Sequence, residues 1–114
     1  MQSGSCHCGA VRFTAEGQPD RAIECNCSHC SSKGLLLWFV PESALVVVAG
    51  QEKLTTYTFN KHVIRHQFCS DCGSQPFSIG RRPDGVETAA VNVRCLDDIE
   101  LERIPRVPVN GREF

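Results

Sequence analysis

The stretch Phe68–Ser74, FCSDCGS, places two cysteines three residues apart and follows them with a glycine. A Cys-x-x-Cys pair that brackets a tight turn can present both sulfurs to one metal ion, and a closed tetrahedral zinc site needs four such ligands. A second pair, Cys6 and Cys8, stands near the N-terminus. In an extended strand residues i and i+2 point to the same face, so these two sulfurs can complete the site.

A third cluster lies between these two pairs. Cys25 and Cys27 can share one face of a strand, and Cys30 comes within reach if the chain turns helical at Ser28. Seven ligands divide most economically into four and three. Four thiolates close a structural zinc site, whereas three leave one position for water or an exogenous thiol, as a reactive zinc requires. The sequence therefore predicts two Zn²⁺ ions per chain.

Other divisions of these ligands stay open. One ion could take Cys6 and Cys8 with two cysteines of the middle cluster, which would leave Cys69 and Cys72 to a weak or empty site. A histidine could instead complete the second site and close it; the candidates are His7, His29 and His66.

The cysteine content favours metal over disulfides. Eight of 114 residues are cysteine, and the N-terminal segment has no basic-then-apolar pattern of a signal peptide. We therefore expect a cytoplasmic protein in a reducing compartment, where thiols stay free to bind metal. The eighth cysteine, Cys95, has no cysteine nearby in the sequence, and we expect it to be a small buried hydrophobe.

Length and composition indicate one globular domain over residues 1–114, with 41% hydrophobic and 22% charged residues. No stretch approaches the ~20 consecutive apolar residues of a membrane helix, so no membrane partner is expected. The formal net charge is −1 and no basic run stands out, which argues against binding nucleic acid through its phosphates.

The pattern of apolar residues predicts a mostly-β fold with one short helix. The helix is expected over Ser28–Lys33, closed by Gly34 at its C-terminal end. The apolar run Leu35–Val40 is expected to be a strand buried on both faces, and the tail after Leu101 to run extended along the surface. The predicted strands are Val11–Ala15, Leu35–Val40, Leu45–Val48, Thr55–Phe59, Ile64–Phe68, Pro76–Ile79 and Ala89–Val93.

Four motifs together resemble the glutathione-dependent formaldehyde-activating enzyme family, which includes centromere protein V. The motifs are Gly4–Phe13 (GSCHCGAVRF), Cys25–Cys30 (CNCSHC), Phe68–Ser74 (FCSDCGS) and Val91–Asp97 (VNVRCLD). The resemblance implies a β-tent fold of small coiled sheets. It also implies a structural zinc on Cys6, Cys8, Cys69 and Cys72 and a catalytic zinc on Cys25, Cys27 and Cys30.

The namesake of the family joins formaldehyde to glutathione, giving S-hydroxymethylglutathione. The resemblance thus implies a carbon–sulfur lyase-like enzyme whose partner is a small thiol such as glutathione. An open site with three cysteines can hold that thiol as thiolate, since metal coordination lowers a thiol pKa. Three thiolates also weaken the Lewis acidity of Zn²⁺, so thiol activation is the favoured role.

Two other classes of function remain. A non-catalytic zinc module for protein binding would have both sites closed. A redox enzyme similar to the methionine sulfoxide reductases would use Cys95, which follows Arg94, as its nucleophile. Among the remaining residues, His66 is expected to face inward, with a role as proton shuttle as the alternative. Arg81 and Arg82 are expected to lie at a solvated hairpin end, with binding of a glutathione carboxylate as the alternative.

Overall fold

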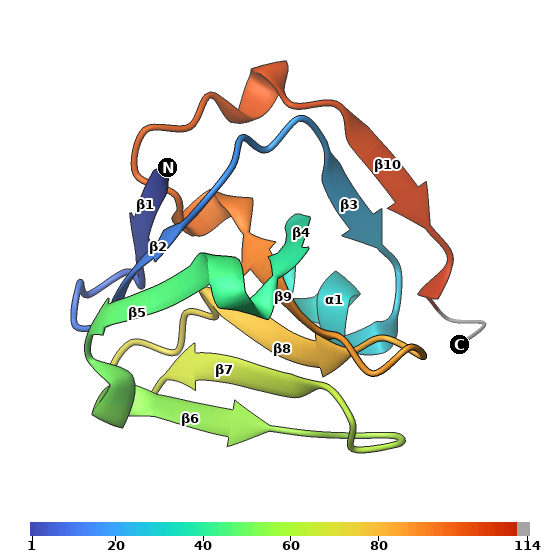
Figure 1. The fold of residues 1–114 in the computed structure, drawn as a ribbon, viewed down its shortest axis with the longest axis horizontal. Coiled ribbons are helices and arrows are strands. Elements are labelled where there is room, and N and C mark those ends of the chain that lie inside the picture. Colours follow the sequence, from blue (N-terminus) through green and yellow to red (C-terminus); the bar gives the residue numbers. More distant parts are fainter. Residues whose placement is uncertain (112–114) are drawn as a thin grey trace.

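The computed structural model describes residues 1–111 of the chain, which form two sheets and one short α-helix (Figure 1). The strands are β1 (Gln2–Ser5), β2 (Arg12–Ala15), β3 (Ala22–Cys25), β4 (Leu37–Pro41), β5 (Leu45–Ala49), β6 (Leu54–Tyr57), β7 (Arg65–Cys69), β8 (Phe77–Arg81), β9 (Glu87–Asn92) and β10 (Arg106–Val109). The helix is α1 (Ser28–Lys33), and short 3₁₀ helices are η1 (Glu42–Ala44), η2 (Gln51–Lys53), η3 (Val93–Cys95) and η4 (Leu101–Arg103). The mostly-β prediction is confirmed, and each predicted strand overlaps an observed one.

The smaller sheet has the strand order β1-β2-β5 and the larger one the order β10-β3-β4-β9-β8-β7-β6. In Figure 1 the larger sheet curves from β10 at the upper right to β6 at the bottom. Its neighbouring strands pair antiparallel, except β10 and β3, which run parallel. None of the helices in the described part of the chain has the length and apolar character needed to cross a membrane.

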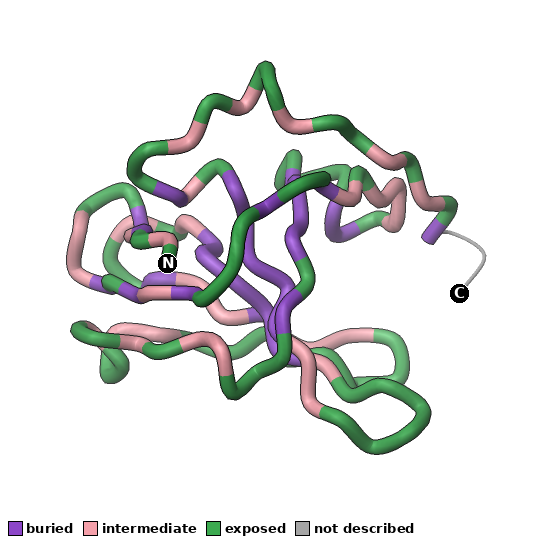
Figure 2. The backbone as a smooth tube through the Cα atoms, turned by 45° about the horizontal axis from the view of Figure 1, so that its top comes forward, coloured by how far each residue is buried: buried purple, intermediate pink, exposed green. Residues whose placement is uncertain are grey.

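One hydrophobic core joins the two sheets. Phe13 of β2 packs in it with Trp38 of β4, and the rings of Phe13 and Phe77 meet edge to face at 5.9 Å. Figure 2 shows these buried segments gathered at the centre of the molecule, with the exposed positions in the peripheral loops. Side chains alternate along a strand, so every second residue of β4, β8 and β9 faces the core and the residues between them face the opposite side of the sheet.

One prediction is wrong because residues of β4 on this opposite face are exposed. The run Leu35–Val40 is not a strand buried on both faces: β4 begins only at Leu37, and Phe39 is 52% exposed. Leu37 and Trp38 are buried, so the run packs well at its start. The apolar composition of this run did not indicate that the side chain of Phe39 is exposed and lines a cavity.

The short helix matches its prediction. The Sγ atom of Cys27, the N-cap residue, accepts a hydrogen bond from the backbone N–H of Cys30 at 3.3 Å. Gly34 ends the helix in the left-handed conformation, with φ 65° and ψ 38°, where a residue without a Cβ is favoured.

The C-terminal tail is extended over Arg106–Val109, as predicted, and also pairs with the large sheet, which the sequence did not indicate. Arg106–Val109 forms β10 and pairs in parallel with β3. In this register Val109 lies opposite Cys25. Pro108 is tolerated because β10 is an edge strand, where a missing backbone N–H removes no ladder hydrogen bond on the open side.

Candidate metal centres

The first cysteine set, called here the four-sulfur group, comprises Cys6, Cys8, Cys69 and Cys72. Its four Sγ atoms lie within 4.8 Å of one another. The Cys6–Cys8 and Cys8–Cys69 sulfur distances are 3.6 and 3.7 Å. A tetrahedron with Zn–S bonds of ~2.3 Å has sulfur–sulfur edges of about 3.8 Å, whereas a disulfide needs about 2.05 Å. The donor set and its spacing fit a zinc ion and exclude paired disulfides.

Two similar turns position these sulfurs. The N–H of Gly9 donates to the carbonyl of Cys6 at 3.1 Å, and the N–H of Gly73 donates to that of Cys69 at 2.8 Å. Both glycines have φ +81°, a backbone conformation that residues with a Cβ rarely adopt. The prediction that Cys6 and Cys8 project from one face of a strand is wrong. Strand β1 ends at Ser5, and both cysteines lie in the turn that follows it.

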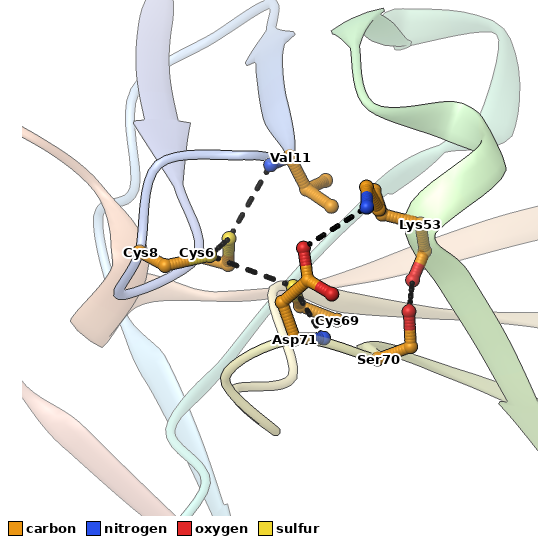
Figure 3. A network of polar contacts seen from close by, with 7 residues as sticks. All are labelled: Cys6, Cys8, Val11, Lys53, Cys69, Ser70 and Asp71. Atoms are coloured by element: carbon orange, nitrogen blue, oxygen red, sulfur yellow. Dashed lines mark hydrogen bonds and ion pairs between the residues drawn. The ribbon is translucent and has the colours of Figure 1, made fainter.

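Polar contacts hold the second turn, around Cys69, against Lys53 of η2 (Figure 3). The hydroxyl of Ser70 donates to the carbonyl of Lys53 at 2.8 Å, and the Lys53 ammonium lies 3.2 Å from the Asp71 carboxylate. Backbone N–H groups also donate to the sulfurs, from Val11 to Cys6 at 3.3 Å and from Asp71 to Cys69 at 3.4 Å. Such hydrogen bonds to sulfur orient a thiolate ligand.

The second set, the three-sulfur group, comprises Cys25, Cys27 and Cys30, whose Sγ atoms also lie within 4.8 Å of one another. Cys25 ends β3, Cys27 caps α1 and Cys30 lies inside α1. The prediction that Cys25 and Cys27 share a strand face is wrong, because Cys27 lies beyond the end of β3. The N-terminal turn of the helix brings the third sulfur to the other two.

Gly111 is a neighbour of this group that the sequence did not indicate. A Cβ placed on Gly111 would collide with the Sγ atom of Cys25 and lie 3.1 Å from the Cβ of Cys27. The backbone after β10 thus packs directly against the three-sulfur group. No local sequence signal marks this glycine, because its role depends on the pairing of β10 with β3.

Each group contains a cysteine whose pKa is lowered, as for Cys72 and Cys27, and one whose pKa is raised, Cys8 or Cys30. Burial acts to raise the pKa of Cys72, but hydrogen bonds from the backbone of Ser74 and Cys8 outweigh it and lower the pKa to about 5. Burial likewise opposes the shift at Cys27, where hydrogen bonds from the backbone and thiol of Cys30 lower the pKa. Thiolates are the form in which cysteine binds metal, so both groups suit a soft divalent cation.

The three-sulfur group lies in the wall of a cavity of about 950 Å³. Other side chains of this wall include Phe39, Phe59, Ile64 and Val86. Of the described residues that line this cavity, none belongs to the four-sulfur group. One candidate metal centre is therefore complete in sulfur, and the other has three sulfurs and adjoins a space that can hold a small molecule.

Four rings stack beside this cavity: those of His29, Tyr57, Phe59 and His66. The His29 and His66 ring centroids are 3.9 Å apart. Both histidines are buried, and neither ring nitrogen of His29 nor Nε2 of His66 has a hydrogen-bond partner. Burial, with the nearby His29 and Lys33, lowers the pKa of His66 to about 4. His66 thus faces inward as expected, and within residues 1–111 no histidine nitrogen joins either sulfur group.

The remaining candidates belong to neither sulfur group. Cys95 lies in η3 and is half-buried rather than buried as expected, and burial, followed by the nearby Cys6 and Cys72, raises its pKa to about 11. Arg81 and Arg82 line the cavity but face carboxylates, with Arg81–Glu87 and Arg82–Asp84 distances of 3.2 and 2.9 Å.

Comparisons with known proteins give matches over most of the chain. A family model described as "Glutathione-dependent formaldehyde-activating enzyme" matches residues 1–109. The fold is similar to the crystal structure of a Rhodobacter sphaeroides protein, with a TM-score of 0.79 and 34% sequence identity. That match covers 92% of this chain and 99% of the other.

Proposed function

The chain belongs to the glutathione-dependent formaldehyde-activating enzyme family, and we propose that it is a zinc-dependent carbon–sulfur lyase-type enzyme. Its substrate is the adduct of a small thiol, such as glutathione, with an aldehyde, such as formaldehyde. Residues 1–114 form a single zinc-binding domain in this proposal.

The proposal assigns the two sulfur groups different roles. The four-sulfur group holds a structural zinc, because four thiolates complete a tetrahedral ion. Cys25, Cys27 and Cys30 hold a second zinc that keeps one position for an exogenous ligand. The observation that carries the proposal is the place of these three sulfurs in a cavity wall, since a reactive ion needs access for substrate.

The reaction needs few protein groups. In the direction of synthesis, the thiol sulfur attacks the carbonyl carbon, a C–S bond forms, the C=O π bond opens, and the thiol proton ends on the new hydroxyl oxygen. A zinc ion bound there would hold the thiol as thiolate at neutral pH. The apolar side chains Phe39, Phe59 and Ile64 line the cavity in which the sulfur would react.

Two observations weigh against the competing functions. A sulfoxide reductase needs an exposed cysteine nucleophile of low pKa, whereas the pKa of Cys95 is raised. A non-catalytic zinc module needs no cavity beside its second metal group, whereas all three cysteines of that group line one.

The test is turnover of the adduct. Zinc-loaded protein is expected to accelerate both formation and breakdown of S-hydroxymethylglutathione, followed by NMR exchange between free and bound formaldehyde. Cys27→Ser should abolish the acceleration and remove one equivalent of zinc, while Cys95→Ala should retain both. If no thiol and aldehyde pair exchanges faster with protein than without it, the proposal is wrong.

A further inference from the structure

The floor of the cavity is the face of the large sheet that points away from the core. Across this face the strand pairing sets Phe39 opposite Ala90, and Ala90 opposite Ser78. In the next row Thr88 lies opposite Gly80. The four positions between the walls thus carry small side chains or none, and since interiors otherwise pack densely, they leave the space that the cavity occupies.

Large apolar side chains stand around this floor. Phe39, Ile64 and Val86 are 52%, 49% and 45% exposed, and all three line the cavity. Exposed apolar side chains gathered at one place mark ligand or partner sites. They share the cavity wall with Cys25, Cys27 and Cys30, where the proposed function places the sulfur of the substrate.

The two arginines of the cavity wall already have partners for their charge. The guanidinium groups of Arg81 and Arg82 each lie within ion-pair distance of a carboxylate, on Glu87 and Asp84. Cavities of ~300–1,000 Å³ hold ligands far larger than a one-carbon group, and an apolar lining favours apolar ligands. The hydroxymethyl group that formaldehyde adds to a thiol has one carbon and a hydroxyl, so it makes little apolar contact with this lining, and the polar tripeptide of glutathione does not match an apolar lining either.

We infer that this cavity selects thiol adducts of aldehydes that bear an apolar alkyl or aryl substituent, in preference to the adduct of formaldehyde. The inference rests on the proposed function and specifies its substrate class. The chemistry is the same addition: a thiol and R–CHO give a hemithioacetal, with one C–S bond formed and the thiol proton moved to the hydroxyl oxygen. The substituent R lies over Ala90, Ser78 and Gly80, between Phe39 and Ile64.

A matched series of stable thioethers tests this inference by binding alone. S-methyl-, S-propyl- and S-hexylglutathione differ only in the alkyl group and undergo no turnover. Burial of each added methylene is expected to tighten binding about fourfold until the cavity is filled, measured by isothermal titration calorimetry on zinc-loaded protein. The heat capacity change of binding should become more negative along the series.

Two variants locate the effect. Gly80→Val places a side chain in the cavity, and a Cβ there meets only Ile64 Cγ1, at 3.7 Å, so the strand accommodates it. This variant should lower the preference for hexyl over methyl by tenfold or more while leaving the S-methyl affinity within about twofold. Phe39→Ala removes one wall and should reduce the same preference. The control is Val48→Ala, which shortens an exposed apolar side chain of β5 outside the cavity lining.

Exchange rates complete the test and separate the two proposals. With glutathione as thiol, hexanal and benzaldehyde should exchange faster than formaldehyde at equal concentration, each relative to its uncatalysed rate. Equal affinity along the thioether series overturns the inference, as does a hexyl preference unchanged in both Gly80→Val and Phe39→Ala. Fast exchange with formaldehyde alone overturns it too but leaves the proposed function intact. Absence of exchange with every aldehyde overturns the proposed function and the inference with it.

Discussion

At the scale of single residues, Gly111 has the most specific structural requirement beside the three-sulfur group. Its backbone packs so closely against Cys25 and Cys27 that no side chain fits between them. The requirement is steric and local to one metal centre, because the four-sulfur group is built from other segments.

Gly111→Ala is therefore expected to lower zinc from two equivalents to one. The added methyl group must displace the Cys25 sulfur or the C-terminal segment, while the four-sulfur group keeps its ion. Zinc content by mass spectrometry, with circular dichroism to verify the fold, measures this. Gly80→Ala is the matched control and should keep two equivalents, since its methyl group meets nothing closer than 3.7 Å. Unchanged zinc content in Gly111→Ala would contradict the packing.

His66 is the second residue with a testable state. Its pKa of about 4 means that the folded protein keeps it neutral down to mildly acidic pH, whereas the unfolded chain protonates it near 6.5. Between these values the unfolded state binds more protons, so acidification favours unfolding.

The free energy of unfolding of wild type should fall relative to that of His66→Phe by about 2 kcal/mol between pH 7 and pH 5. The phenyl ring keeps the stack with His29 and Phe59 but carries no titratable group. Urea denaturation at saturating zinc measures both proteins, so that metal loss affects them alike. Parallel pH profiles would show that His66 does not titrate in this range.

At the scale of elements, two tight turns, which place Cys8 and Cys69 61 residues apart in the sequence, carry the four-sulfur group and bring the two sheets together. The first turn follows β1 of the small sheet and the second follows β7 of the large one. A centre that links the sheets in this way stabilises the whole fold, and a structural zinc in small peptides contributes on the order of 10 kcal/mol.

Cys72→Ser is accordingly expected to unfold the protein or make it insoluble, because it removes one of four ligands. Thermal unfolding monitored by circular dichroism, together with the soluble yield, measures the effect. Cys95→Ala removes a cysteine outside both groups and should melt within a few degrees of wild type. A Cys72→Ser protein that melts like wild type in the presence of chelator would exclude a structural role for this group.

At the scale of the whole molecule, the two candidate centres differ in their surroundings. The four-sulfur group combines the buried Cys6 and Cys69 with the exposed Cys8, whereas all three cysteines of the other group line a cavity that can admit a ligand. The second centre also has one sulfur fewer. Its metal should therefore be held less tightly and be removed without loss of the fold.

A mild chelator is expected to take one zinc equivalent in a fast phase while the circular dichroism spectrum persists. The second equivalent should leave slowly and together with unfolding. Cys27→Ser should show the slow phase alone. Simultaneous loss of both ions with unfolding in wild type would indicate two structural centres and favour a non-catalytic zinc module.

The sequence by itself determined the features that depend on local chemistry. Helix α1 has the predicted bounds because Gly34 ends it and because its first turn needs only neighbouring residues. Strands β2 and β5 follow from their apolar alternation and β-branched content. Spacing and ligand number favoured a grouping of the cysteines into four and three but left other divisions open, and the structure brings the sulfurs together in those two sets.

Only the tertiary structure decided what depends on contacts between distant segments. Strand β10 exists because β3 offers it a free edge, and that pairing places Gly111 against Cys25. The cavity exists because register sets Ala90 and Ser78 side by side beneath Phe39. An apolar run such as Leu35–Val40 has the same composition whether it faces a core or a ligand, since burial is a property of what packs against a strand.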